Sequence, residues 1–467
     1  MKKCADLHRG IVLRLACPEQ RLDCLPISAV TLNLDCRDEL IPILRSLQHL
    51  YADAPVRREL LGLVGKDVNK STSRKRGRRG MNYWEITVLA GVRLGCNLDY
   101  DKLQDLAENH RRLRQIMGIG TWQDEEVDFD WRRIENNLLK LRPASLKKLN
   151  DLIVRVGHEL EPQAVTSVRG DTFVVETNIP YPTESNLIGD GLRKVVTLAA
   201  RLASAQGWSG WRQHEHWLYK VKKQVRDIGR ASRTKSKDGP VRLRAGYKEL
   251  LALAVALLQR GRQLAATLQA PGNLSVFNLA GGADAKELLQ YADLTAQVCD
   301  TARRRVLEGE TVPNADKIFS IFEPHTELIM RGKQPNPTQF GHLTLVVEDA
   351  VGFVVDYRVV DAGVLDQDLV VPVMRELQKR FAGKIESASF DRSVHTPQNQ
   401  QDLAEIVRTP CIASKGHEKG RQQQQESTVA FRRARQRHSG IESVIGALQA
   451  GNGLKRCRDR SAPGYER

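Results

Sequence analysis

The spacing of apolar residues predicts helices in the first third of the chain and strands after it. Apolar side chains that recur every three or four residues predict helices at residues 38–52, 84–94, 100–106 and 110–116. From Ala164 the period shortens to two, and strands are expected over residues 166–171 and 173–178. Residues 190–312 then return to a helical pattern without a strand signal.

The last third alternates between the two patterns. Strands are expected at residues 326–330, 342–348, 351–360, 385–390 and 409–413, with the second and third forming a hairpin. Helices are expected at residues 367–381, 397–407 and 428–449, and a polar loop at 422–425. Such an alternation predicts a mixed sheet with helices on both faces, and ligands of such sheets bind at strand ends.

Three carboxylates fall at informative places in this pattern. Asp171 belongs to the first strand-like run, Asp391 directly follows a buried strand, and Glu442 is expected on the last helix, one turn after His438 and on its face. Asp171 and Asp391 are 220 residues apart, which is too long for one simple sheet, so we interpret the helical block as an insertion. A single Asp is usually a cap or a surface charge, but these three are expected to point to one place.

Three carboxylates can hold two magnesium ions about 3.5–4 Å apart, an arrangement used to cut phosphodiesters. Magnesium prefers oxygen ligands. The eight cysteines are scattered without a CxxC pair, so the sequence indicates neither a zinc ribbon nor a dithiol site and is typical of a reduced, cytosolic protein. Signal-peptide and membrane-spanning patterns are both missing from the sequence, so no membrane partner is expected.

The charge of the chain favours a polyanionic partner. The 467 residues include 72 Lys and Arg against 56 Asp and Glu, a formal net charge of +16. Residues 70–80 carry six positive charges and no negative one, and should be extended or disordered until they meet phosphate. The short helices that follow are typical of a helix-turn-helix DNA-binding module, although a plain three-helix bundle gives the same pattern. A second basic run, at residues 220–237, is another candidate phosphate-contacting face, whereas the tryptophans before it are more often core residues.

Several motifs, taken together and in order, resemble one family. The run from Asp171 to Ser185 is similar to the first-aspartate motif of bacterial insertion-sequence transposases of the ISNCY-like group, which are DDE enzymes with an RNase H-like catalytic fold. The resemblance also covers residues 77–118, 317–327, 390–392, 438–443 and 453–460. It departs from the family at Ser393 and Val394, where a glycine and an aromatic residue are usual, and at the C-terminus, where a further apolar helix is expected and truncation is one interpretation.

The resemblance implies an α/β fold: an RNase H-like mixed sheet with a large helical insertion, preceded by a helical DNA-binding region. The expected domains are an N-terminal helical region at 1–66, a basic arm with a helix-turn-helix-like module at 67–163, and a catalytic domain at 164–467 with its insertion at about 190–312. It also implies that Asp171, Asp391 and Glu442 are the catalytic and metal-binding triad for Mg²⁺ or Mn²⁺, with two ions. The expected DNA contacts are Arg74, Lys75, Arg76, Arg78, Arg79, Arg435, His438, Lys455 and Arg458.

The predicted function is therefore DNA transposition. Such an enzyme binds the terminal inverted repeats of its element, cuts a phosphodiester at each end and joins the freed 3′ hydroxyl to target DNA. It is expected to act on double-stranded DNA as a homodimer or larger assembly, in the bacterial cytoplasm at the nucleoid. Two alternatives stay open: a catalytically inactive, truncated transposase that only binds DNA, and a nuclease of the same fold. His438 itself could contact DNA, orient Glu442 or simply pack in the helix interface.

Overall fold

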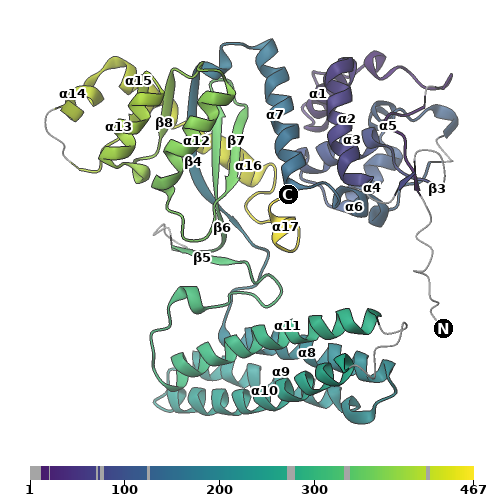
Figure 1. The fold of residues 1–467 in the computed structure, drawn as a ribbon, viewed down its shortest axis with the longest axis vertical. Coiled ribbons are helices and arrows are strands. Elements are labelled where there is room, and N and C mark those ends of the chain that lie inside the picture. Colours follow the sequence, from purple (N-terminus) through teal and green to yellow (C-terminus); the bar gives the residue numbers. More distant parts are fainter. Residues whose placement is uncertain are drawn as a thin grey trace. The chain divides into compact units, whose positions relative to one another are not determined.

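The computed structural model describes residues 12–19, 21–69, 72–73, 78–123, 127–270, 279–330, 337–416 and 421–467 (Figure 1). They form a mixed α/β protein that is mostly helical and contains a six-stranded mixed sheet. The chain divides into two compact units, one of Met1–Glu176 with His342–Arg467 and the other of Thr177–Gly341. None of the helices in these described ranges combines the length and the apolar character that crossing a membrane requires.

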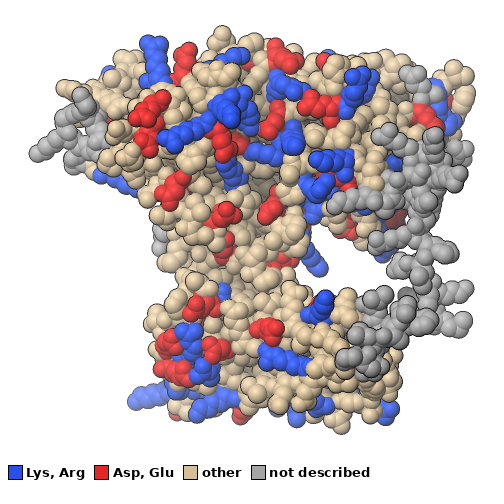
Figure 2. All heavy atoms as spheres, in the orientation of Figure 1, with Lys and Arg blue, Asp and Glu red and all other residues tan. Residues whose placement is uncertain are grey.

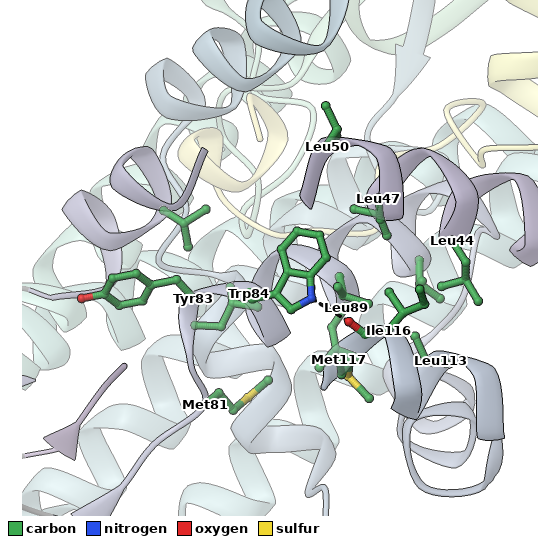
Figure 3. Close-up of a cluster of buried hydrophobic side chains, with 14 of the residues drawn as sticks. Leu44, Leu47, Leu50, Met81, Tyr83, Trp84, Leu89, Leu113, Ile116 and Met117 are labelled. Atoms are coloured by element: carbon green, nitrogen blue, oxygen red, sulfur yellow. Dashed lines mark hydrogen bonds between the residues drawn. The ribbon is translucent and has the colours of Figure 1, made fainter. Parts of the chain in front are cut away.

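The N-terminal part of the first unit is a group of helices around one apolar core. They are α1 (Leu40–Ala52), α2 (Ala54–Val68), α3 (Tyr83–Gly95), α4 (Tyr100–Asn109), α5 (Arg111–Met117), α6 (Trp131–Leu138) and α7 (Pro143–Leu160). The Trp84 indole lies fully buried between side chains of α1 and α5 and donates to the Ile116 carbonyl at 2.6 Å (Figure 3). A capping box of Asn82 and Glu85 begins α3, and the left-handed Gly118 ends α5. The predicted helices at 38–52, 84–94, 100–106 and 110–116 are thus confirmed.

Helix α2 was not predicted, because a proline at position 55 is often found where helical structure has ended. The proline instead lies in the first turn of α2, where its missing N–H has no partner to lose. Asp53 separates the two helices, and its side chain accepts a hydrogen bond from the Val56 N–H at 2.9 Å. Three two-residue strands complete this region: β1 (Val12–Leu13) pairs in parallel with both β2 (Thr72–Ser73) and β3 (Arg78–Arg79).

The sheet has the strand order β5-β6-β4-β8-β9, with β7 also paired to β6. Its strands are β4 (Ser167–Glu176), β5 (Glu327–Met330), β6 (Thr338–Asp349), β7 (Val354–Val359), β8 (Ser387–Phe390) and β9 (Thr409–Ile412). The predicted hairpin is confirmed, since β6 and β7 are antiparallel neighbours, and β4, β8 and β9 run parallel. Strand β6 runs antiparallel to β4, because Arg169 pairs with Glu348 while Ala164 accepts from the Ala350 N–H.

The prediction of two strands at 166–171 and 173–178 was wrong, because β4 is one continuous strand. The polar Thr172 made the pattern look interrupted. Its side chain is buried nonetheless, because its hydroxyl donates to a carboxylate oxygen of Asp366 at 2.9 Å. The hydrogen bond satisfies the hydroxyl inside the fold, so the strand continues without a break.

Helices cover both faces of the sheet, as predicted. On one face Val168, Val347 and Phe390 share a core with α12 (Asp366–Arg380), α13 (Pro397–Ile406) and Val154 of α7. On the other face Phe173, Val175 and Val346 meet Ile445 and Leu448 of α16 (Ile441–Ala450). Helix α15 (Val429–His438) lies on this second face too, where its Phe431 and Ala434 pack on Cys411 of β9.

The predicted long helix at 428–449 was wrong. It is divided into α15 and α16 at Ser439 and Gly440, where the Gly440 N–H bonds back to the Arg437 carbonyl at 3.1 Å. The predicted loop at 422–425 was also wrong, since α14 (Arg421–Ser427) is helical there. A contact with the segment before it holds α14: the Glu426 carboxylate accepts hydrogen bonds from the N–H and hydroxyl of Ser414, 12 residues earlier.

The C-terminal residues join the N-terminal helices to the sheet within the first unit. Glu176 of β4 forms a parallel bridge with Arg456, and the Tyr465 hydroxyl donates to the Val175 carbonyl at 2.6 Å. Asn452 donates to the Leu94 and Gly95 carbonyls at the end of α3, and Asp459 pairs with Arg93 of the same helix at 3.1 Å. A short helix, α17 (Ala462–Tyr465), lies at the end of this segment.

The second unit is built mainly from four helices around their own core. These are α8 (Glu184–Ala205), α9 (His214–Arg233), α10 (Gly239–Gln269) and α11 (Leu279–Ala302), which continues as a π-helix over Arg303–Leu307. The described residues between 190 and 312 are helices and turns, as predicted. Trp211 is buried in this core and Trp208 and Trp217 pack against it, so the tryptophans are core residues.

Candidate functional site

The first predicted carboxylate lies on β4, and the second directly follows the neighbouring parallel strand β8. Strands β4 and β8 pair from Ser167 with Ser387 to Gly170 with Phe390, and one further step in this register sets Asp171 beside Asp391. Both also point to the same face. Val168 and Gly170 lie toward the core that holds Phe390, so by alternation Arg169 and Asp171 lie toward α15 and α16. The parallel register thus brings together two residues 220 positions apart.

A tight turn holds Asp391 as it leaves the strand. Its side chain caps the 3₁₀ helix Arg392–Val394 and accepts from the Ser393 N–H at 3.3 Å. Burial alone would raise the pKa of Asp391, but hydrogen bonds from Ser393 and Arg392 and the nearby His438 outweigh it and lower the pKa below the usual 3.8. Asp391 is therefore ionised at neutral pH. The departure from the family pattern at Val394 is accommodated, because that side chain is buried in the sheet core.

Glu442 lies in the first turn of α16 with an exposed side chain. The helix is anchored one turn later, where Ile445 and then Leu448 pack on the Asp171 face of the sheet. Glu442 precedes Ile445 by three residues, so the two share one side of the helix. The third predicted carboxylate therefore belongs to an element that lies on the same face of the sheet as Asp171.

His438 lies between these groups at the end of α15. Its ring hydrogen-bonds the Ser389 backbone. The negative charges of Asp391 and Glu442 favour the protonated ring, and the positive charge of Arg169 disfavours it. Burial is the largest effect and lowers the pKa of His438 below 6.5, so the ring is neutral near pH 7. One continuous helix carrying both His438 and Glu442 was predicted. The break after α15 instead places them on two helices. These contacts favour a packing role, and a DNA contact of His438 stays a prediction.

Arg169 was not predicted as a site residue, yet it joins β4 to β6 and to the end of α15. Its Nε donates at 2.5 Å to the carboxylate of Glu348, whose side chain is only 2% exposed. Its Nη1 donates at 2.7 Å to the Arg437 carbonyl at the end of α15. Gly440 makes room for this guanidinium, since a Cβ there would lie 2.7 Å from Cζ of Arg169. One signal was available: Arg169 precedes Asp171 by two residues and so shares its face.

The predicted DNA-contacting residues fall into three groups. Arg74, Lys75 and Arg76 lie outside the described residues, and Arg78 and Arg79 form β3. Arg435 and Lys455 are exposed, on α15 and on the C-terminal segment. Arg458 is exposed as well, although its Nη1 donates to the Asn97 carbonyl at 3.2 Å, a contact within the protein. All of these DNA contacts stay predictions.

The donor chemistry of the site suits a hard cation, but its geometry is not closed. Asp171, Asp391 and Glu442 offer carboxylate oxygens, which are the ligands that magnesium and manganese prefer. In the part of the chain that the structure describes, no three His, Cys, Asp or Glu side chains are gathered closely enough to hold one metal ion. The fold thus brings the three carboxylates to one face without closing them around one point.

Comparisons of the chain with protein-family models, with curated proteins and with solved structures found no match in any of the three. The resemblance to transposases therefore rests on the sequence motifs.

Proposed function

We propose that the protein is a DDE-type DNA transposase whose sheet domain has the RNase H-like fold. The observation that supports the proposal is the parallel register of β4 and β8, whose last pair, Gly170 with Phe390, directly precedes Asp171 and Asp391 in the two chain segments. The antiparallel hairpin of β6 and β7 next to β4, the parallel strands β8 and β9, and helices on both faces are what we expect of such a domain. The helix that bears Glu442 lies on the same face as Asp171.

The proposed chemistry is two in-line displacements at phosphorus. Water adds to a phosphodiester at the element end, the bond from phosphorus to the 3′ oxygen breaks, and a 3′ hydroxyl is freed. That hydroxyl then attacks a phosphodiester of the target DNA and displaces a 3′ oxygen there. The ionised Asp391 and its neighbours would position the reacting groups, and the basic chain would neutralise phosphate charge.

Metal binding is part of the proposal. Asp171, Asp391 and Glu442 would hold Mg²⁺ or Mn²⁺ as a pair of ions, because three carboxylates can supply the ligands of a two-metal site. When bound, such ions activate the attacking oxygen and stabilise the leaving one. Glu442 is exposed in the first turn of α16, and its side chain would have to move toward the other two carboxylates to complete such a site. Two element ends must be held at once, so a homodimer or larger assembly on DNA in the bacterial cytoplasm is part of the same proposal.

One observation favours a second candidate, a DNA-binding protein without catalysis. The three carboxylates are not gathered as a metal site within the described residues. A chain that retains the fold and the basic surface but cannot close this site would bind element ends without cutting them. A nuclease of the same fold would cut without joining.

The experiment is a cleavage assay on DNA that carries the gene with its native flanks, with magnesium, with manganese and with EDTA. We compare the wild type with Asp171→Asn and Asp391→Asn, and with Asp361→Asn as a control for the loss of one exposed carboxylate. Metal-dependent nicks at the element boundaries that only the first two variants lose would support the transposase. Binding without any cut would support the second candidate, and cuts without joined products would support the nuclease.

A further inference from the structure

Half of the net charge of the protein is concentrated in one short stretch of the second unit. Residues 220–249 contain eleven Lys and Arg and three Asp and Glu, which gives +8 of the total +16 in 30 residues. This stretch covers most of α9, the turn after it and the start of α10. Figure 2 shows one face of this unit, with Lys and Arg along its lower edge in that view.

Four of the six Lys and Arg residues of α9 lie along one face of the helix. Lys222, Arg226, Arg230 and Arg233 follow one another at spacings of four, four and three residues, and all are exposed. We call these four residues the α9 stripe. Because a helix rises about 1.5 Å per residue, the stripe is about 16 Å long. The opposite side of the helix is fixed in the core by Val221 and Ile228, which are 3% and 2% exposed.

The stripe has few anionic partners, whereas several other cations of the same unit are paired. Arg201, Arg262 and Lys194 pair with acidic residues of α11, and Arg303, Arg304 and Arg305 are paired as well. Among the described residues, the stripe has one ion pair, from Arg230 to Asp227 at 3.6 Å. Like charges at this helical spacing cost about 0.2–0.5 kcal/mol for each pair, which a polyanion would offset.

We propose that the α9 stripe is a binding surface for the backbone of duplex DNA. Over its length of about 16 Å, duplex DNA presents roughly nine phosphate charges. A membrane surface fits less well, because a membrane-binding helix presents an apolar face, and the apolar face of α9 is already buried. The inference rests on the proposed function, with which it shares its partner, and adds a contact separate from the N-terminal module and the carboxylates.

The test measures how the affinity of the full-length protein for DNA depends on salt. The probe is a labelled 30-base-pair duplex of random sequence, and KCl is varied around 0.1 M. The stripe variant is Lys222→Gln with Arg226→Gln and Arg233→Gln. The control variant is Lys286→Gln with Arg375→Gln and Lys379→Gln, which removes the same charge from exposed residues of α11 and α12 that have no ion pair in the described structure.

Each phosphate contact contributes about 0.9 to the slope of log Kobs against log salt, so the stripe variant should lower the slope by about 2–3. The control variant should leave the slope near that of the wild type. A variant that keeps the charges, Lys222→Arg with Arg226→Lys and Arg233→Lys, should also keep the slope. Circular dichroism of each variant separates a lost contact from a lost fold. If the triple variant does not fold, the single variants Lys222→Gln and Arg233→Gln are measured instead. Each should lower the slope by about 0.9.

The proposal is overturned if the stripe variant has the slope of the control variant, if the charge-preserving variant loses the slope, or if the protein binds anionic vesicles and not duplex DNA. These results are distinct from the fate of the proposed function. A lowered slope in a protein that never cuts DNA would support the stripe and count against the transposase. Cleavage at element ends, together with a stripe variant whose slope is unchanged, would support the transposase and count against the stripe.

Discussion

Gly440 offers a sharp test of how the helix that bears Glu442 is held. Its backbone is in the right-handed region, with φ −67° and ψ −19°, so alanine is allowed there by the main chain. A Cβ, however, would lie 2.7 Å from Cζ and 3.0 Å from Nη2 of Arg169. That guanidinium cannot yield freely, because Glu348 and the Arg437 carbonyl both hold it. Gly440→Ala must therefore displace Arg169 or the start of α16.

The cost follows from what Arg169 would lose. Overpacking a filled site costs about 1–3 kcal/mol, and a hydrogen bond to a charged group contributes about 1.5–3 kcal/mol. Full loss of the pair would leave the buried Glu348 uncompensated and cost about 3–5 kcal/mol. Partial displacement is the expected outcome, so Gly440→Ala should destabilise the α16 region by about 1–3 kcal/mol.

Gly446 provides a matched control on the same helix. Nothing lies within 4 Å of the position that its Cβ would occupy. Gly446→Ala should therefore stabilise α16 by about 0.5–1 kcal/mol, the usual gain for alanine over glycine in a helix. The two glycine-to-alanine substitutions, six residues apart, should thus change the stability of α16 in opposite directions.

The assay is hydrogen exchange of the α16 amides, which reports the free energy of local opening, with thermal unfolding as a global check. Gly440→Ala should lower protection and Gly446→Ala should raise it. The reasoning is refuted if Gly440→Ala is as stable as the wild type. A double-mutant cycle with Arg169→Gln adds a second condition: the cost of Gly440→Ala should shrink when the guanidinium is gone.

Two further predictions concern contacts that hold the first unit together. Tyr465→Phe removes a hydroxyl that donates to the Val175 carbonyl and accepts from the His342 N–H, so the melting temperature should fall in line with a loss of about 1–2 kcal/mol; an unchanged melting temperature would contradict it. Asp67 is fully buried, and although burial would raise its pKa, hydrogen bonds from Arg142 and Ser145 lower it below 3.8. The stabilisation that the Asp67 carboxylate contributes is therefore complete above the usual pKa of 3.8. It is lost as the pH falls through the lowered pKa of the folded state. Denaturant titrations of Asp67→Asn should show a deficit near neutral pH that narrows in acid, and a deficit that is constant with pH would argue against this account.

The sequence predicted most of the elements because their patterns are local. The alternation in residues 342–360 predicted the hairpin, and Asp391 after a short apolar run predicted a carboxylate at a strand end. Two of the failures involve contacts with residues far away in the chain. Thr172 looked like a strand break until Asp366, 194 residues later, satisfied its hydroxyl. The helix break at Gly440 accompanies a contact with Arg169, which lies 271 residues earlier in the chain, although the Ser439-Gly440 pair was also a local sign of a turn.

The candidate site was predictable in its residues and not in its geometry. A strand-end aspartate can be found from sequence, whereas the parallel pairing of β4 with β8, whose last pair of Gly170 with Phe390 precedes Asp171 and Asp391, joins segments 220 residues apart. The burial that makes His438 neutral likewise depends on elements far apart in the chain.

The C-terminal segment has a consequence for biosynthesis. Asp459 pairs with Arg93, and Asn452 bonds to the Leu94 and Gly95 carbonyls, partners that are synthesised more than 350 residues earlier. At about 5–20 residues per second, the ribosome needs tens of seconds to cover that interval. Throughout this time α3 must exist on the nascent chain without its final neighbours. We therefore expect pulse proteolysis of stalled chains to find cleavage at the end of α3 that the full-length protein resists.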